Sequence, residues 1–205
     1  MSAPIMKIGE ESISKAAGIV GKGGLVVYPT DTVYGLGADP FNEKAIRRLF
    51  AAKGRSGKPV PVLCSSLQKA TELVELSARG VGLARDHWPG AFTIVAPLKK
   101  RLPSILTQGT GNLGVRVPAH QGCLDLISAC GGWLTGTSAN LSGQLSARTA
   151  QEAGIQLSDS VDLILDGGSL VGKESTVALV VGDEVTILRG GPIGVREEMK
   201  RRRTS

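Results

Sequence analysis

Along the 205-residue chain, short apolar runs alternate with stretches of helical periodicity, and few folds accommodate such an order. The runs that predict strands are residues 24–30, 60–66, 92–98, 113–118 and 161–168, and those that predict helices are 41–55, 67–86 and 122–132. Strands mixed with helices predict an α/β domain around one twisted sheet. An expected hairpin over residues 175–192 argues against a purely parallel sheet. No internal repeat or linker interrupts the order, so we expect a single domain.

The composition argues against several classes of protein. Only 3% of the residues are aromatic, which disfavours a nucleic-acid reader that stacks bases. The three cysteines (Cys64, Cys123 and Cys130) lack C-x-x-C spacing, and His87 and His120 lie far apart, so neither a disulfide framework nor a zinc site is expected. The sequence shows no membrane-spanning apolar run and no signal peptide, which predicts a cytoplasmic protein without a membrane partner.

A net charge of +6 predicts anionic partners such as nucleotides, phosphates or RNA. Part of this charge lies in residues 196–205, which we interpret as a solvated basic tail. A dedicated RNA contact of the tail is the alternative.

The stretch from Leu25 to Pro40, LVVYPTDTVYGLGADP, ends an apolar strand and continues with threonines and glycines. Ligands of open α/β sheets bind at the carboxyl ends of the strands, so these hydroxyls could form one wall of a small-molecule site. A simple turn capped by Asp31 accounts for the same residues equally well.

Cationic side chains occur in two further segments. Lys53, Arg55 and Lys58 follow a helix and either stabilise its negative end or bind phosphates. Arg116 stands between apolar neighbours in a predicted strand and either reaches solvent or projects into a polar cavity, where it would bind a carboxylate or phosphate.

Polar side chains gather in two more places. Residues 135–143, TGTSANLSG, supply neutral donors and acceptors or form a helix cap, and without a G-x-S-x-G elbow they do not indicate a serine hydrolase. The predicted hairpin brings Ser175 and Arg189 to one end of the sheet, whereas Glu174 is interpreted as a solvated neighbour. Neither a Walker A motif nor a G-x-G-x-x-G turn between a predicted strand and a helix is present, so scattered cations and hydroxyls would have to bind any nucleotide.

Seven segments in this order resemble the YrdC-like family, the threonylcarbamoyl-AMP synthases also called TsaC. They read YPTDTVYGLG, KGR, WPG, VRVPAH, TSANLSG, ESTV and LRGGPIG. The resemblance covers residues 12–195 as one catalytic domain of the short form and leaves 196–205 as the tail. It implies a twisted mixed sheet with flanking helices around a large basic cavity.

The resemblance also implies an activity. L-Threonine, bicarbonate (or carbon dioxide) and ATP, with Mg²⁺ bound to the nucleotide, would give threonylcarbamoyl-AMP and pyrophosphate. Other proteins would then transfer the threonylcarbamoyl group to the adenosine beside a tRNA anticodon, and weak tRNA binding is compatible with this role. The alternatives are an RNA-binding module of the same fold and a YciO-like relative with another substrate.

The resemblance assigns residues by motif. Those expected to bind threonine are Thr32, Arg116, Gly136 and Ser175. Those expected around ATP are Lys53, Arg55, Lys58, Asn112, Ser138, Asn140, Ser146 and Arg189. Lys53 and Arg55 are the expected catalytic residues, since they would neutralise charge on the phosphates. The resemblance also implies that a K-x-R pair and an S-x-N pair distinguish synthases from YciO-type proteins, and both pairs are present here. No metal-binding side chain is assigned. The segment between Arg55 and the strand that begins at residue 60 is one residue shorter than the family pattern. This difference shifts the alignment with the family, so Leu63 is not assigned as a substrate contact.

Overall fold

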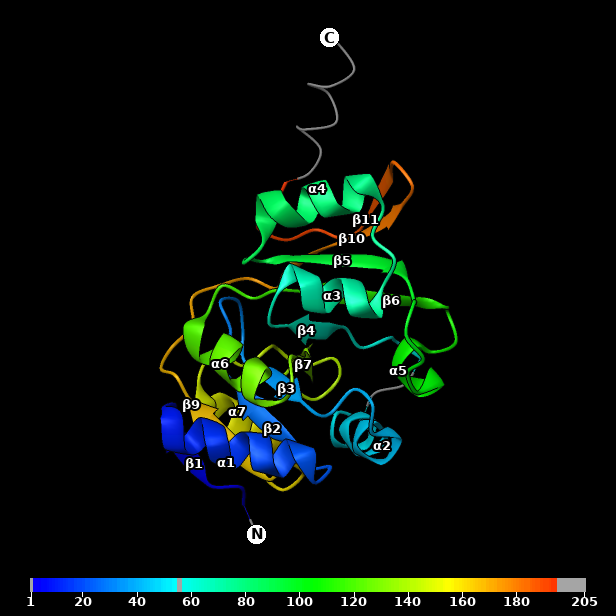
Figure 1. Cartoon of the computed structure of the whole chain (residues 1–205). Coiled ribbons are helices and arrows are strands. Elements are labelled where there is room, and N and C mark those ends of the chain that lie inside the picture. Colours follow the sequence, from blue (N-terminus) through cyan, green and yellow to red (C-terminus); the bar gives the residue numbers. More distant parts are fainter. Residues whose placement is uncertain (1, 55–56, 195–205) are drawn as a thin grey trace.

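The computed structural model of the chain describes residues 2–54 and 57–194. Its strands form two mixed sheets, and Figure 1 shows one sheet above the other. The five-stranded sheet has the order β1 (Ile5–Lys7), β9 (Leu163–Asp166), β2 (Val26–Tyr28), β3 (Gly35–Gly37), β8 (Thr137–Ser138). The six-stranded sheet has the order β11 (Glu184–Arg189), β10 (Thr176–Val181), β5 (Phe92–Pro97), β6 (Asn112–Arg116), β4 (Val62–Cys64), β7 (Trp133–Thr135).

Residues 133–138 connect the two sheets. Strand β7 pairs with β4 in one sheet, and β8, which begins two residues after β7 ends, pairs with β3 in the other. Gly136 stands between them, where an added Cβ would approach the side chain of Leu63 to 2.5 Å. Glycine therefore lets the chain pass closely from one sheet to the other, and this crossing positions the candidate site.

Seven helices of the described residues cover the sheets (Figure 1). They are α1 (Glu10–Gly21), α2 (Glu43–Ala52), α3 (Leu67–Leu73), α4 (Ala78–His87), α5 (Ser104–Thr107), α6 (Gln121–Ala129) and α7 (Ala150–Leu157). Side chains cap five of them by accepting a hydrogen bond from the backbone N–H three residues on. The capping residues are Asn42, Ser66, Ser77, His120 and Thr149.

The buried side chains form two apolar clusters. The smaller cluster joins α1 and α6 to the five-stranded sheet and includes Ala16, Leu126 and Leu163. The larger cluster joins the remaining helices to both sheets and includes Ile46 and Ile94. Most buried side chains are aliphatic, as the low aromatic content requires.

The predicted mixed α/β fold is confirmed, although the strands divide between two sheets where one was expected. The helix predicted over residues 41–55 is confirmed as α2, with Asn42 at its cap. The hairpin is confirmed as β10 and β11, which meet at Gly182.

The prediction of one helix over residues 67–86 is wrong. Val74 pairs in a β-bridge with Leu98, and the N–H of Glu75 donates to the Pro97 carbonyl at 2.9 Å. Ser77 then caps a second helix, α4. Pairing with the end of β5 therefore breaks a stretch whose apolar spacing is helical throughout.

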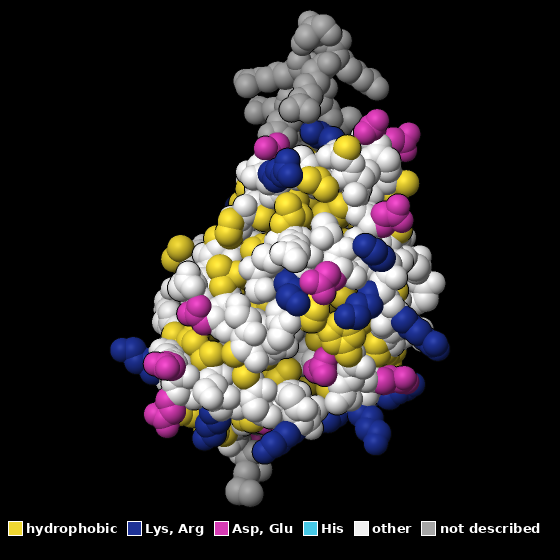
Figure 2. Space-filling view, in the orientation of Figure 1, with side chains coloured by type: hydrophobic (Ala, Val, Ile, Leu, Met, Phe, Trp, Pro, Cys, Tyr) yellow, Lys and Arg dark blue, Asp and Glu magenta, His cyan; other side chains and the backbone are white. Residues whose placement is uncertain are grey.

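Helices α1 and α7 were not predicted, because they bury mainly small residues such as Ala16, Ala150 and Ala153, whose periodicity is weak. None of the described helices combines the length and apolarity needed to cross a bilayer. On the face shown in Figure 2, basic and acidic side chains are interspersed. The predicted basic tail lies outside the described residues.

Candidate functional site

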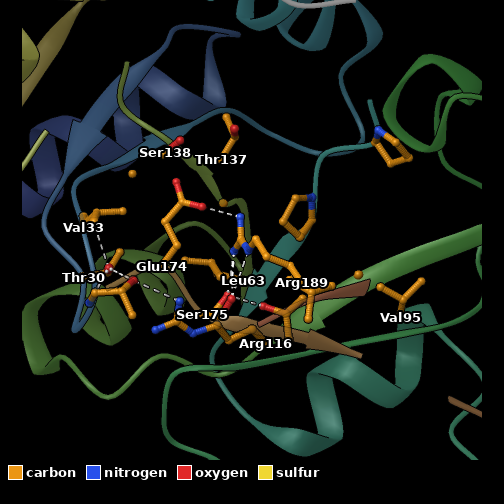
Figure 3. A pocket seen from close by; sticks show the side chains of 18 of the residues that line it. Thr30, Val33, Leu63, Val95, Arg116, Thr137, Ser138, Glu174, Ser175 and Arg189 are labelled. Atoms are coloured by element: carbon orange, nitrogen blue, oxygen red, sulfur yellow. Dashed lines mark hydrogen bonds and ion pairs between the residues drawn. The ribbon is translucent and has the colours of Figure 1, made fainter. Parts of the chain in front are cut away.

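A cavity of about 390 Å³ lies where the two sheets meet. Its walls come from the loop after β2, from β4, β5 and β6, from the crossing between β7 and β8, and from the hairpin β10–β11. The predicted site residues that line it are Thr32, Asn112, Arg116, Gly136, Ser138, Ser175 and Arg189. Figure 3 shows Arg116, Ser175 and Arg189 close together among the side chains that line it.

Arg116 is buried, with 5% of its surface exposed, so the alternative in which it reaches solvent does not hold. Its guanidinium pairs with the carboxylate of Asp31, donates through Nε to the Gly90 carbonyl at 2.8 Å and donates to Thr32 Oγ1 at 3.2 Å. These contacts fix the plane of the guanidinium beside the cavity.

The loop after β2 is both a turn and a cavity wall. Thr30 Oγ1 donates to the Val33 carbonyl at 2.7 Å and accepts from the Thr32 N–H at 3.0 Å. The two threonine hydroxyls share a further hydrogen bond of 3.0 Å, and both residues line the cavity. The predicted turn and the predicted cavity wall are thus the same loop, but the side chain that caps the turn is Thr30, whereas the Asp31 carboxylate pairs with Arg116.

The hairpin brings Ser175 and Arg189 together, as the sequence predicted. Arg189 donates to the Ser175 carbonyl through Nε at 3.1 Å, and Ser175 Oγ shares a hydrogen bond of 2.9 Å with Thr93. Glu174 was interpreted as a solvated neighbour, but it lines the cavity, pairs with Arg189 at 2.5 Å and accepts from Ser146 Oγ at 2.6 Å. The sequence signal that could have placed Glu174 at the cavity was its position directly before Ser175.

Lys53 caps the carboxyl end of α2 but points inward, with 2% of its surface exposed. Its ammonium donates to the carbonyls of Ser138 and Asn140, the latter at 2.7 Å, and its own carbonyl accepts from the Ser142 N–H at 2.9 Å. These contacts attach Lys53 to the segment that carries the lining residue Ser138.

The other residues predicted to bind the nucleotide differ in how they are connected to the cavity. Asn140 is buried and donates to the carbonyls of Leu141 and Gln144, which shapes the loop after β8. Ser146 reaches the cavity through Glu174, and Lys58 is an exposed neighbour of the lining residue Pro59. The catalytic prediction for Arg55 lies outside the described residues.

Sequence reasoning left out Leu63, which lines the cavity from β4. It also missed Tyr28, a lining residue whose hydroxyl donates to the Thr135 carbonyl at 2.6 Å. Burial raises the pKa of Tyr28 well above its usual value, so this phenol stays protonated and acts as a fixed donor.

The two mixed sheets and their cavity, lined by two arginines and several hydroxyls, define an α/β protein suited to a small anionic ligand. The family model Sua5_yciO_yrdC, described as "Telomere recombination", matches residues 18–191. The chain belongs to this Sua5/YciO/YrdC family, as the sequence motifs predicted.

Three relatives illustrate the similarity. The chain is 36% identical over 194 residues to the threonylcarbamoyl-AMP synthase of Pyrococcus abyssi, covering 93% of this chain and 57% of that protein. A crystal structure of P. abyssi Sua5 complexed with L-threonine superposes with a TM-score of 0.89 at 35% identity, covering 97% of this chain and 59% of that one. The crystal structure of E. coli YciO gives a TM-score of 0.87 at 28% identity, covering 95% and 98%. The chain thus spans less than two thirds of the P. abyssi protein.

Proposed function

We propose that the protein is an L-threonylcarbamoyladenylate synthase, a nucleotidyltransferase that uses L-threonine, bicarbonate or carbon dioxide, and ATP. The observation that carries this proposal is the convergence of Arg116 and Arg189, from β6 and β11, on one cavity rimmed by hydroxyls. Two cationic groups of this kind suit a ligand pair with two anionic ends, an amino-acid carboxylate and a polyphosphate. The similarity to a synthase and to a threonine-bound relative supports the choice of ligands.

The threonine subsite of this proposal is built around Arg116. The carboxylate of threonine would lie against the fixed guanidinium, with the hydroxyls of Thr32 and Ser175 and the close backbone of Gly136 around the rest of the molecule. Because Arg116 is buried and already oriented, little order has to be created when the ligand binds.

In the proposed reaction, the threonine nitrogen attacks the carbon of carbon dioxide, an N–C bond forms, and the amine gives up a proton. A carbamate oxygen then attacks the α-phosphorus of ATP, and the bond to the β-phosphate breaks as pyrophosphate leaves. No covalent intermediate with the protein is required. The cavity contributes alignment of the two reactants, which accounts for barrier reductions on the order of 7–11 kcal/mol in well-oriented systems.

The polyphosphate of ATP would lie toward Arg189, Ser138 and Asn112, with Arg55 as a further proposed ligand. Positive charge placed there would stabilise the departing pyrophosphate. Lys53 would contribute by holding the segment of Ser138 and Asn140 in place.

Magnesium would arrive with ATP. Among the described residues no cluster of three or more His, Cys, Asp and Glu could hold a metal ion, and Glu174 is the carboxylate that lines the cavity. This donor set suits an ion bound mainly by phosphate oxygens and waters.

Threonine, bicarbonate, Mg-ATP and pyrophosphatase incubated with the protein should yield threonylcarbamoyl-AMP, detected by mass spectrometry. Arg116→Ala should weaken threonine binding at least about tenfold in calorimetry and leave ATP binding within about twofold, because it removes a charge-assisted contact to the carboxylate. Arg47→Ala, which removes an exposed arginine of α2, is the matched control. Absence of product from folded protein, or a larger loss of ATP than of threonine binding, would contradict the proposal.

Transfer of the threonylcarbamoyl group to tRNA would be carried out by other proteins in the same cytoplasmic compartment. The second candidate is a YciO-like activity, favoured by the TM-score of 0.87 with E. coli YciO. A YciO-like activity predicts that threonine, bicarbonate and ATP do not react in the presence of this protein. An RNA-binding module would instead show salt-sensitive RNA binding that threonine and ATP leave unchanged.

A further inference from the structure

We propose that Glu174 is an exchangeable counter-ion at the phosphate subsite: its carboxylate binds the donors of Ser146 and Arg189, and a bound polyphosphate takes these donors over. The inference rests on the proposed function, because Ser146 and Arg189 are the residues expected around ATP. The two oxygens of Glu174 have separate partners, with Oε1 accepting from Ser146 Oγ at 2.6 Å and Oε2 from Arg189 at 2.5 Å. The carboxylate thus bridges a hydroxyl and a guanidinium, as a phosphate group would.

The donor that Glu174 and a bound phosphate cannot share is the hydroxyl of Ser146. A serine hydroxyl has a single proton to donate, and that of Ser146 is directed at Glu174. Arg189 directs its Nε and one terminal nitrogen at Ser175 and its other terminal nitrogen at Glu174. Each terminal nitrogen of Arg189 carries a second N–H, so the guanidinium can contact both anions, but a phosphate that accepts from Ser146 Oγ has to displace the Glu174 carboxylate from that hydroxyl.

The exposure of the ion pair makes such an exchange feasible. The side chains of Arg189 and Glu174 are 47% and 38% exposed, and ion pairs this open to water are weak. The pair between Arg116 and Asp31 is different, because its side chains are only 6% and 14% exposed and Arg116 has further partners in Gly90 and Thr32. Of these two ion pairs among the described residues, the one between Arg116 and Asp31 is thus fixed and the one between Arg189 and Glu174 is replaceable.

The exchange should change the affinity of the cavity for anionic ligands in one direction. A displaced Glu174 carboxylate stays close to the polyphosphate and repels it, so Glu174 lowers the affinity for anionic ligands. The same competition favours the departure of pyrophosphate, since the carboxylate can return to Ser146 and Arg189.

The test compares Glu174→Gln with wild type in calorimetric titrations with inorganic pyrophosphate, ATP and adenosine. Glutamine keeps the shape and an acceptor oxygen but removes the charge. We expect pyrophosphate and ATP to bind roughly three- to tenfold more tightly, and adenosine to bind within about twofold of wild type. Glu184→Gln is the matched control, because Glu184 is an exposed carboxylate at the opposite end of β11 and its loss should leave all three affinities within about twofold.

Tighter binding of both anions in Glu174→Gln alone would support the exchange, and Glu174→Ala should change the affinities in the same direction. Weaker anion binding would overturn the inference and make Glu174 a positioning residue for Arg189, and unchanged binding would also overturn it. Equal shifts in Glu184→Gln would reduce the effect to net charge and overturn it too. Failure to form threonylcarbamoyl-AMP while the Glu174→Gln effect persists would overturn the proposed function alone.

Discussion

At the scale of single residues, Lys53 shows how a buried cation can hold the wall of a cavity. The ammonium is buried and donates to backbone carbonyls of residues 138 and 140, which follow the crossing between the sheets. A buried charge is tolerated only with such partners, because desolvation otherwise makes it very costly. The position of Lys53 thus couples the end of α2 to the wall that carries Ser138.

Lys53→Met should therefore destabilise the protein by about 2–4 kcal/mol, because an apolar side chain of similar length removes the buried ammonium that donates to the carbonyls of Ser138 and Asn140. Lys44→Met, at an exposed position of the same helix, should change stability by less than about 0.5 kcal/mol. Urea unfolding followed by circular dichroism measures both. Equal stability of the two variants would show that the buried contacts contribute little.

The candidate site could be predicted from the sequence where a motif fixes the local backbone. Thr32, Arg116, Ser175 and Arg189 lie around one cavity, as the ordered motifs implied. The ion pair between Arg189 and Glu174 was not predicted, because it depends on the hairpin register, and the contact between Ser146 and Glu174 depends on the packing of a distant loop. A single sequence gives residue types but not such pairings.

At the scale of secondary-structure elements, the hairpin β10–β11 delivers Arg189 to the cavity. Gly182 opens its turn with φ +58°, a conformation that glycine adopts without strain, and its carbonyl accepts from the cap residue Ser77 at 2.6 Å. The turn therefore also links the hairpin to the start of α4.

Two glycine-to-alanine changes should have opposite effects. Gly182→Ala should lower the free energy of unfolding by about 1 kcal/mol, because alanine is strained at positive φ. Gly18→Ala should raise it by roughly 0.5–1 kcal/mol, because Gly18 is exposed in the interior of α1 with nothing within 4 Å of an added Cβ. Thermal unfolding of both variants gives the signs. A stabilised Gly182→Ala would contradict the assigned turn geometry.

Elements were predictable where one apolar face is large and unpredictable where the tertiary structure decides. Helix α2 buries Ile46, Leu49 and Phe50 on one side, which is a strong periodic signal. The break at Val74 has only a weak local signal, the cap residue Ser77, because the bridge to Leu98 depends on a segment that lies later in the chain. The short strands β7 and β8 exist because each has a partner in a different sheet.

At the scale of the whole molecule, the division into two sheets creates the cavity. The expected single sheet would need residues 133–138 to continue along one edge, whereas they leave β4 and join β3. This change of partner depends on the arrangement of all the strands, and so the apolar pattern predicted the fold class but not the number of sheets.

Several cysteine thiols and tyrosine phenols are buried or partly buried, and this predicts a decline in stability at alkaline pH. Burial raises the pKa values of the thiols Cys64 and Cys123, raises that of Cys130 to about 12, and raises those of Tyr28 and Tyr34. In the unfolded chain these groups lose protons near pH 9 for thiols and 10 for phenols. Above about pH 9 the unfolded state therefore binds fewer protons than the folded state, and the free energy of unfolding falls as the pH rises.

In urea unfolding, these groups should contribute a constant amount to the free energy of unfolding up to about pH 8. From about pH 9 upward the free energy of unfolding should decline, with a slope of up to about 1.4 kcal/mol per pH unit for each group that has ionised only in the unfolded state. Cys130→Ala should make the slope of this decline smaller by the contribution of one ionising group, because alanine has no proton to lose. Cys130 is only partly buried, so the substitution should be tolerated. Ser128→Ala, two residues earlier in α6, removes a side chain that does not ionise in this range and should leave the slope unchanged. A free energy of unfolding that stays constant to about pH 10.5 would show that the buried thiols and phenols ionise as readily in the folded protein as in the unfolded chain.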